Sequence, residues 1–149
     1  SFLRRGGGGL LTLALLGLGS SADALPIAFV DGVGADNERR YPIPTADGAT
    51  IDRRAQIILV RHGGHVFAMA LACPHENAAV KWLASDGRFQ CTKHDSRYTP
   101  EGTYTSGHAT RNLDRFPVRR EQNEIVVTVD RVFRSDQNLA QWTAAGVAL

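Results

Sequence analysis

Two cysteines, each with a histidine close behind it, constrain this chain more than any other feature of its sequence. One residue separates Cys73 from His75, two separate Cys91 from His94, and fifteen lie between the two pairs. A disulfide would not require a histidine beside each cysteine, whereas two thiolates and two imidazoles can hold a tetrahedral zinc ion or an iron–sulfur cluster. The two cysteines could still form one disulfide, but their pairing with histidine indicates a metal held between two separate segments.

The order of the four residues helps to choose between zinc and iron. Zinc sites commonly run Cys, Cys, His, His along the sequence. Here each half of the pattern contributes one thiol and one imidazole. Equivalent halves suit a two-iron cluster in which one iron takes both sulfurs and the other takes both nitrogens. A zinc-stabilised binding module without a redox role stays open as an alternative.

Short β-branched runs separated by turn signals predict an all-β domain, a small sandwich or barrel. A tight turn with two central glycines over residues 62–65 joins the first two runs. Further turns are expected at 85–87 and 99–102. We expect strands at residues 55–60, 66–72, 88–91, 115–119 and 124–129, the last two forming a hairpin.

The first thirty residues have the pattern of an export signal. Arg4 and Arg5 precede an uncharged run over residues 6–19, which resembles a twin-arginine signal. A small-residue cleavage site follows, and cleavage there would release a soluble protein that begins near Leu25. The alternative, which we favour, is that residues 1–30 remain as an anchor, which places the protein on the periplasmic side of the bacterial inner membrane.

Composition and pattern divide the rest of the chain into three parts. Residues 31–54 are rich in Gly, Asp, Arg and Pro, and we expect a linker there with one short strand near 40–43. The all-β metal-binding domain is expected over residues 55–134. A tail over residues 135–149 follows it.

The tail is the one part of the chain with a helical pattern. Ser135 and Asp136 are suitable capping residues for a helix over residues 137–147. Such a helix would carry Leu139 and Trp142 on one face. This apolar stripe can pack on the sheet of the same chain or on a neighbouring subunit, and the sequence does not choose between them.

The spacing C-x-H, fifteen residues, C-x-x-H resembles the pattern of the Rieske [2Fe-2S] iron–sulfur protein family. The resemblance covers residues 55–130 and extends beyond the four metal-binding positions. It implies an all-β Rieske-type sandwich with a cluster-binding subdomain and one [2Fe-2S] cluster. The further matching residues are 79–82, Phe89, Ser96, Tyr98, Gly102, Leu113 and Val118.

The resemblance also implies a role for each metal-binding residue. Cys73 and Cys91 would bind the buried iron, and His75 and His94 the outer iron near the tip of the domain. Neutral imidazoles in place of two thiolates leave the cluster less negative, which raises its reduction potential above that of an all-cysteine ferredoxin. The histidines lose protons more readily when the iron is oxidised, so reduction can be coupled to proton uptake.

Two hydroxyl groups match family positions that tune the cluster. Ser96 lies two places after the second histidine and Tyr98 four places after it. By resemblance, the serine donates to a bridging sulfide and the tyrosine to a cysteine sulfur. Both donors favour the electron-rich reduced state, so we expect a potential toward the upper part of the Rieske range.

Three departures from the family pattern concern the residues around the cluster. Quinol-oxidising members have a disulfide between the two loops, and Ala78 and Lys93 stand at the matching positions. Asp95 replaces the glycine that follows the second histidine, and residues 107–110 replace a proline-rich loop. These changes put a quinol-oxidising role in doubt without threatening the cluster.

The other three histidines are weaker candidates for a functional role. His62 and His65 flank the glycine turn and are expected to be surface residues. His108 lies in the loop that replaces the proline-rich segment. It could face a partner or a haem, but an exposed loop histidine is the preferred interpretation.

The formal net charge is +2 and the sequence has no basic stripe, so nothing indicates a nucleic-acid partner. We expect one-electron transfer as a subunit of a periplasmic or membrane-bound redox complex, with a c-type cytochrome or an oxidoreductase subunit as partner. A quinol-oxidising subunit of a cytochrome bc-type complex and a soluble ferredoxin that feeds an oxygenase are alternatives. The chain has no length left for a mononuclear iron domain, so we expect no substrate chemistry from it alone.

Overall fold

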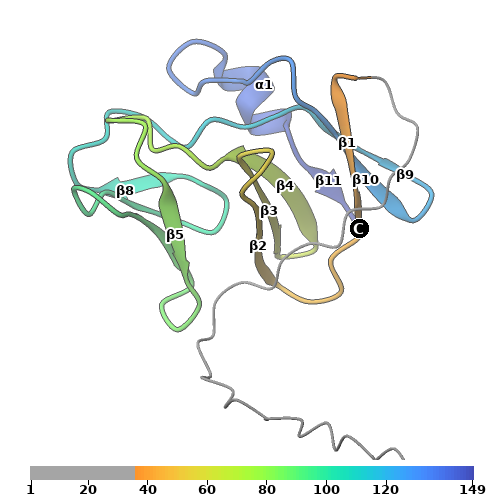
Figure 1. The fold of residues 1–149 in the computed structure, drawn as a ribbon, viewed down its shortest axis with the longest axis horizontal. Coiled ribbons are helices and arrows are strands. Elements are labelled where there is room, and N and C mark those ends of the chain that lie inside the picture. Colours follow the sequence, from red (N-terminus) through yellow and green to blue (C-terminus); the bar gives the residue numbers. More distant parts are fainter. Residues whose placement is uncertain (1–35) are drawn as a thin grey trace, which may run out of the picture.

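The computed structural model describes residues 36–149, and this part of the chain forms three antiparallel sheets arranged side by side (Figure 1). The strand orders are β1-β10-β9, β11-β4-β3-β2 and β5-β6-β7-β8. The elements are β1 Glu38–Pro42, β2 Gly48–Asp52, β3 Ile57–His62, β4 His65–Ala70, β5 Val80–Leu83, β6 Arg88–Cys91, β7 Arg97–Tyr98, β8 Tyr104–Ser106, β9 Val118–Glu121, β10 Glu124–Thr128, α1 Leu139–Ala144 and β11 Val147–Ala148.

The all-β prediction is confirmed, and β3, β4, β6, β9 and β10 match the expected strands with somewhat different ends. The expected linker needs correction, because the described part of residues 31–54 contains two strands rather than one. β2 includes Gly48 and Asp52, which disfavour strands, but it pairs with β3 along its whole length. β1 pairs in the same way with β10.

The signal or anchor expected over residues 1–30 lies outside the described residues. Among residues 36–149, no helix has the length and apolar character that crossing a membrane requires.

β3 belongs to the middle sheet of the molecule, and its side chains enter the apolar cores on both faces of that sheet. Ile57 and Leu59 pack into one apolar core with β1 and β10, whereas Ile58 and Val60 pack into a second core with β5 and β6. Successive side chains of a strand point to opposite faces, so an uninterrupted apolar run fits a strand that is covered on both sides. The run at residues 57–60 thus determines the three-layer arrangement.

The sheet β5-β6-β7-β8, called here the site sheet, lies at one end of the molecule (Figure 1). Two loops extend from it: residues 71–79 lead from β4 into β5, and residues 92–96 lead from β6 into β7. Both cysteines belong to the second core, beside Phe89 and Leu113. The apolar layer between the central sheet and the site sheet therefore continues directly into the expected metal site.

The tail differs from its prediction. The helix spans only Leu139–Ala144, begins after Asn138 rather than Asp136, and has no side-chain cap. Trp142 is buried whereas Leu139 is 60% exposed, so the two do not share a buried face. After the helix the chain pairs with β4 as strand β11, and Gly146 lies against the ring of Phe67. The tail thus packs on the sheet of its own chain.

A buried arginine connects the tail to the domain. The guanidinium carbon of Arg115 lies 3.8 Å from the centre of the Trp142 ring and 4.4 Å from that of Phe67. Its nitrogens donate to the carbonyls of Trp142 and Glu101 at 2.8 and 2.7 Å. Burial lowers the pKa of Arg115 to about 10, so it stays charged at neutral pH. Trp142 Nε1 donates to the Leu113 carbonyl at 2.7 Å, which ties the tail to the segment that follows the site sheet.

We expect Trp142→Ala to lower the free energy of unfolding by about 3–5 kcal/mol, because it removes a buried ring and its contact with a buried cation. Leu139→Ala is the matched control within the same helix. Its side chain is exposed, so the change should stay within about 0.5 kcal/mol. Urea unfolding of both variants measures the difference, and equal effects would show that the tail is not held by Trp142.

Candidate metal centre

Backbone hydrogen bonds hold the two loops of the expected metal site against each other. The pairing of β5 with β6 puts Val80 opposite Cys91. One residue beyond that pair, the backbone N–H and the hydroxyl of Thr92 both donate to the carbonyl of Ala79, at 3.1 and 2.8 Å. Within the first loop, Cys73 N–H donates to the Ala78 carbonyl at 2.7 Å. Within the second loop, Cys91 N–H donates to the Ser96 carbonyl at 2.8 Å, so each loop is closed on itself and bonded to the other.

Both cysteine thiols are buried, and neither forms a disulfide. Burial raises the pKa of Cys73, and the hydroxyl of Tyr98 opposes this. Burial also acts to raise the pKa of Cys91, but the backbone N–H groups of His94 and Lys93 and the thiol of Cys73 outweigh it, so its pKa is lowered. The two thiols are thus close enough to affect each other's pKa, and the backbone N–H groups favour the thiolate form of Cys91, which is the form that binds metal.

The two histidines lie together at the surface. The rings of His75 and His94 are exposed, with centroids 5.3 Å apart. Within residues 36–149, the set of donor atoms that converges within 4.8 Å comprises these two histidines and Glu76, and it includes neither cysteine. Thiols and imidazoles therefore do not converge on one point, as a single zinc ion would require. Two buried sulfurs and two exposed nitrogens fit a two-iron cluster.

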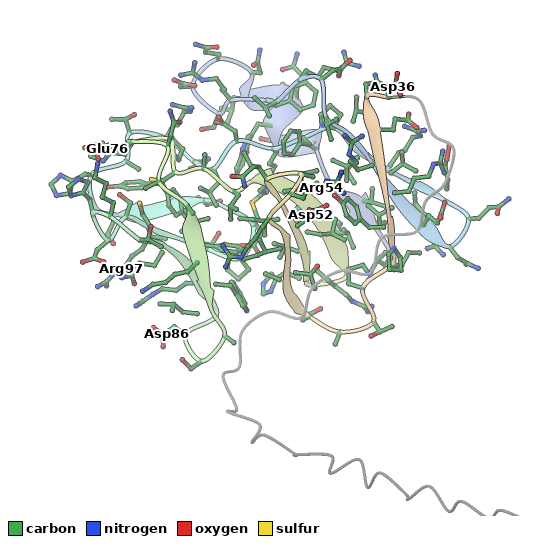
Figure 2. The ribbon with its side chains drawn as sticks, in the orientation of Figure 1. Asp36, Asp52, Arg54, Glu76, Asp86 and Arg97 are labelled. Carbon is green, nitrogen blue, oxygen red and sulfur yellow. The ribbon has the colours of Figure 1, made fainter. Side chains whose placement is uncertain are left out.

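Glu76 is a residue at this site that the sequence analysis missed. Its carboxylate lies 2.6 Å from the Lys93 ammonium and 3.2 Å from His94 Nε2. The pKa of Glu76 is lowered, chiefly by the hydrogen bond from Lys93. Figure 2 shows Glu76 at the outer end of the site sheet. Its position directly after His75 was a possible signal, but the contact depends on how the two loops meet.

The two expected hydroxyl donors are fully buried. Tyr98 Oη lies 3.2 Å from Cys73 Sγ, which is the contact that the sequence analysis expected. Burial and the nearby thiol raise the pKa of Tyr98, so it remains a protonated donor. Ser96 Oγ accepts the backbone N–H of Ala109 at 3.0 Å.

Of the other three histidines, one lies at this site and two make contacts elsewhere. The His108 ring lies 5.7 Å from that of His75 and 5.8 Å from that of His94, so it belongs to the same exposed group. His62 pairs with Glu101 at 3.2 Å, and His65 contacts the Gly63 carbonyl.

Asp95, which replaces a family glycine, has a φ of 57°. Asp is among the residues that tolerate this left-handed conformation. Its carboxylate accepts a hydrogen bond from Gln90 at 2.8 Å. Asp95 therefore brings a negative charge near the expected site.

We expect the purified protein to contain two irons and two inorganic sulfides per chain, because the donors do not converge on a single ion. Cys73→Ser and His94→Ala should lose iron and visible absorption. His62→Ala is a matched control, since that ring pairs with Glu101 instead. Metal analysis and absorption spectra measure the outcome, and one zinc per chain would contradict the assignment.

Comparison with known proteins agrees with this geometry. The model of the Rieske [2Fe-2S] domain family matches residues 42–117. The cytochrome b6-f complex iron-sulfur subunit of Chlorobaculum tepidum is 31% identical over 74 residues, which are 50% of this chain and 41% of that subunit.

Two solved structures are also similar. The plasma membrane Rieske protein PetC3 of Synechocystis has a TM-score of 0.48 and 24% identity, over 54% of this chain and 84% of that one. The ferredoxin of carbazole 1,9a-dioxygenase from Nocardioides aromaticivorans has a TM-score of 0.42 and 18% identity, over 73% of this chain and all of that one.

Proposed function

The chain belongs to the Rieske [2Fe-2S] domain family, and from this membership we propose that Cys73, His75, Cys91 and His94 hold the [2Fe-2S] cluster. The observation that carries the assignment is the separation of the four donors into two buried thiols and two exposed imidazoles. When bound, such a cluster stores and releases one electron. The protein is thus a Rieske-type iron–sulfur electron-transfer protein, related to a cytochrome b6-f subunit.

The residues around the four donors have two different roles: some shield the thiols from water, and others lie exposed where a partner can bind. The second core covers the thiols, so water has little access to them. The exposed imidazoles of His75 and His94 are the part that a redox partner can contact. Because His108 lies beside both rings, it is positioned to take part in the same contact.

Hydrogen bonds and charges act on the reduction potential in opposite directions. Tyr98 and Ser96 supply hydroxyl hydrogens that favour the reduced state. Glu76 and Asp95 bring carboxylates to the outer side, and negative charge disfavours added electrons. The hydroxyls are fully buried whereas Glu76 is partly solvated, so we assign the larger effect to the hydroxyls. The proposed potential is toward the upper part of the Rieske range.

Electron paramagnetic resonance of the reduced protein tests the cluster assignment. The expected spectrum has the low average g value of a Rieske cluster. We expect Ser96→Ala and Tyr98→Phe each to lower the midpoint potential, because each removes a hydrogen bond that is stronger to the electron-rich reduced cluster. The upper bound of each shift is the equivalent of a whole hydrogen bond to a charged group, about 1.5–3 kcal/mol. Ser106→Ala, at an exposed position of β8, is the control for the serine change. Unchanged potentials in both variants would refute the role of the hydroxyls.

For the biological role, we infer a subunit of a periplasmic or membrane-bound redox complex that exchanges electrons with a c-type cytochrome or an oxidoreductase subunit. The export-like pattern of residues 1–30 supports this location. Ala78 and Lys93 stand where quinol-oxidising members have their disulfide, which supports a partner other than quinol.

A quinol-oxidising subunit of a cytochrome bc-type complex is the second candidate. The observation in its favour is the similarity to a subunit of a cytochrome b6-f complex. Copurification from membranes with a neighbouring c-type cytochrome or dehydrogenase subunit supports the first role, whereas copurification with a cytochrome b supports the second. Recovery only from the cytoplasmic fraction would contradict both.

A further inference from the structure

The loop over residues 107–110, called here the covering loop, lies directly on Ser96. Gly107 has a φ of +105°, and a Cβ added to it would come within 2.5 Å of Ser96 Cα. The next contact is the hydrogen bond from Ala109 N–H to Ser96 Oγ at 3.0 Å. The loop backbone therefore approaches Ser96 so closely that only a glycine fits at position 107. The loop also limits which hydrogen bonds the Ser96 hydroxyl can form.

A serine hydroxyl has one hydrogen and two lone pairs. Accepting the N–H of Ala109 occupies one lone pair of Ser96 and leaves its hydrogen free to donate elsewhere. The direction of that hydrogen thus depends on the covering loop staying in place. If the loop moves away, Ser96 loses this amide and can turn its own hydrogen toward another acceptor.

Tyr104 holds the covering loop in place. It lies on β8, opposite Tyr98 on β7. Its hydroxyl donates to the Gly107 carbonyl at 2.5 Å. Its ring meets that of Tyr98 edge-on, with centroids 6.2 Å apart and planes at 69°. One half-buried side chain therefore contacts the loop that orients Ser96 and also the ring that carries the second hydroxyl donor.

We propose that Tyr104 is a positioning residue for the cluster, which keeps the Ser96 and Tyr98 hydroxyls directed at it. The proposal rests on the cluster assignment made above. Its hydroxyl acts mainly on Ser96 through Gly107 and Ala109, whereas its ring acts on Tyr98. Tyr104→Phe separates these effects, because it removes the hydroxyl and keeps the ring.

Tyr104→Phe should lower the midpoint potential, by less than Ser96→Ala does, because the serine remains but is less well oriented. Amide exchange of the segment 107–110 should become roughly fivefold faster, the effect of one lost hydrogen bond. Tyr41→Phe is the matched control: it also removes one hydroxyl, from a bond of 2.8 Å to Asp52, but in the opposite core. It should change neither quantity.

The double variant Ser96→Ala with Tyr104→Phe tests the route of the effect. If the hydroxyl acts through Ser96, adding Tyr104→Phe to Ser96→Ala should lower the potential no further. An unchanged potential in Tyr104→Phe, or a fully additive decrease in the double variant, would overturn the proposal. Absence of a Rieske signal from the unmodified protein would overturn the cluster assignment instead, and with it the role of Tyr104.

Discussion

The pairing register between β5 and β6 is the constraint on which the metal site depends. Val80 lies opposite Cys91, and the two bonds from Thr92 to Ala79 extend the pairing into the loops. Alternate residues of a strand face opposite sides, so a slip of one residue would turn Cys91 out of the apolar core. The thiol would then be exposed, and the second loop would no longer meet the first.

This register also explains why the site has an inner and an outer half. The thiols continue the core formed by Phe89 and Leu113, whereas the histidines extend past the strand ends into solvent. Hydroxyl donors accompany the buried half, and the charged groups of Glu76 and Lys93 accompany the exposed half. The first arrangement favours holding an electron, and the second provides a surface where another protein can receive it.

Sequence reasoning identified those parts of the fold that local pattern determines. The apolar run at 57–60 and the glycine turn at 62–65 predicted a hairpin, and the structure has it. β5 was not predicted as a strand, because its four residues gain their order from pairing with β6. The tail helix was predicted too long, because the pairing of Val147 with Val66 in β4 is a long-range contact that a helical pattern does not reveal.

The same distinction applies to the site. Spacing alone selected the two cysteines and two histidines, and the position of Tyr98 indicated its contact with Cys73. The Glu76–His94 contact and the hydrogen bond from Tyr104 to Gly107 were not predictable, because both join residues whose proximity depends on loop conformation. His108 is an exposed loop residue, as expected, but its place beside the other two rings was not predictable, because the covering loop brings it there.

We propose that the two thiols bind one iron of a two-iron cluster and that the two imidazoles bind the other. Electron–nuclear double resonance of the reduced protein, with histidine labelled with nitrogen-15, tests this most directly. Two distinct histidine nitrogen couplings are the expected result, and neither should be lost in a His108→Ala variant. A single coupling, or none, would contradict the assignment of His75 and His94 as the outer pair.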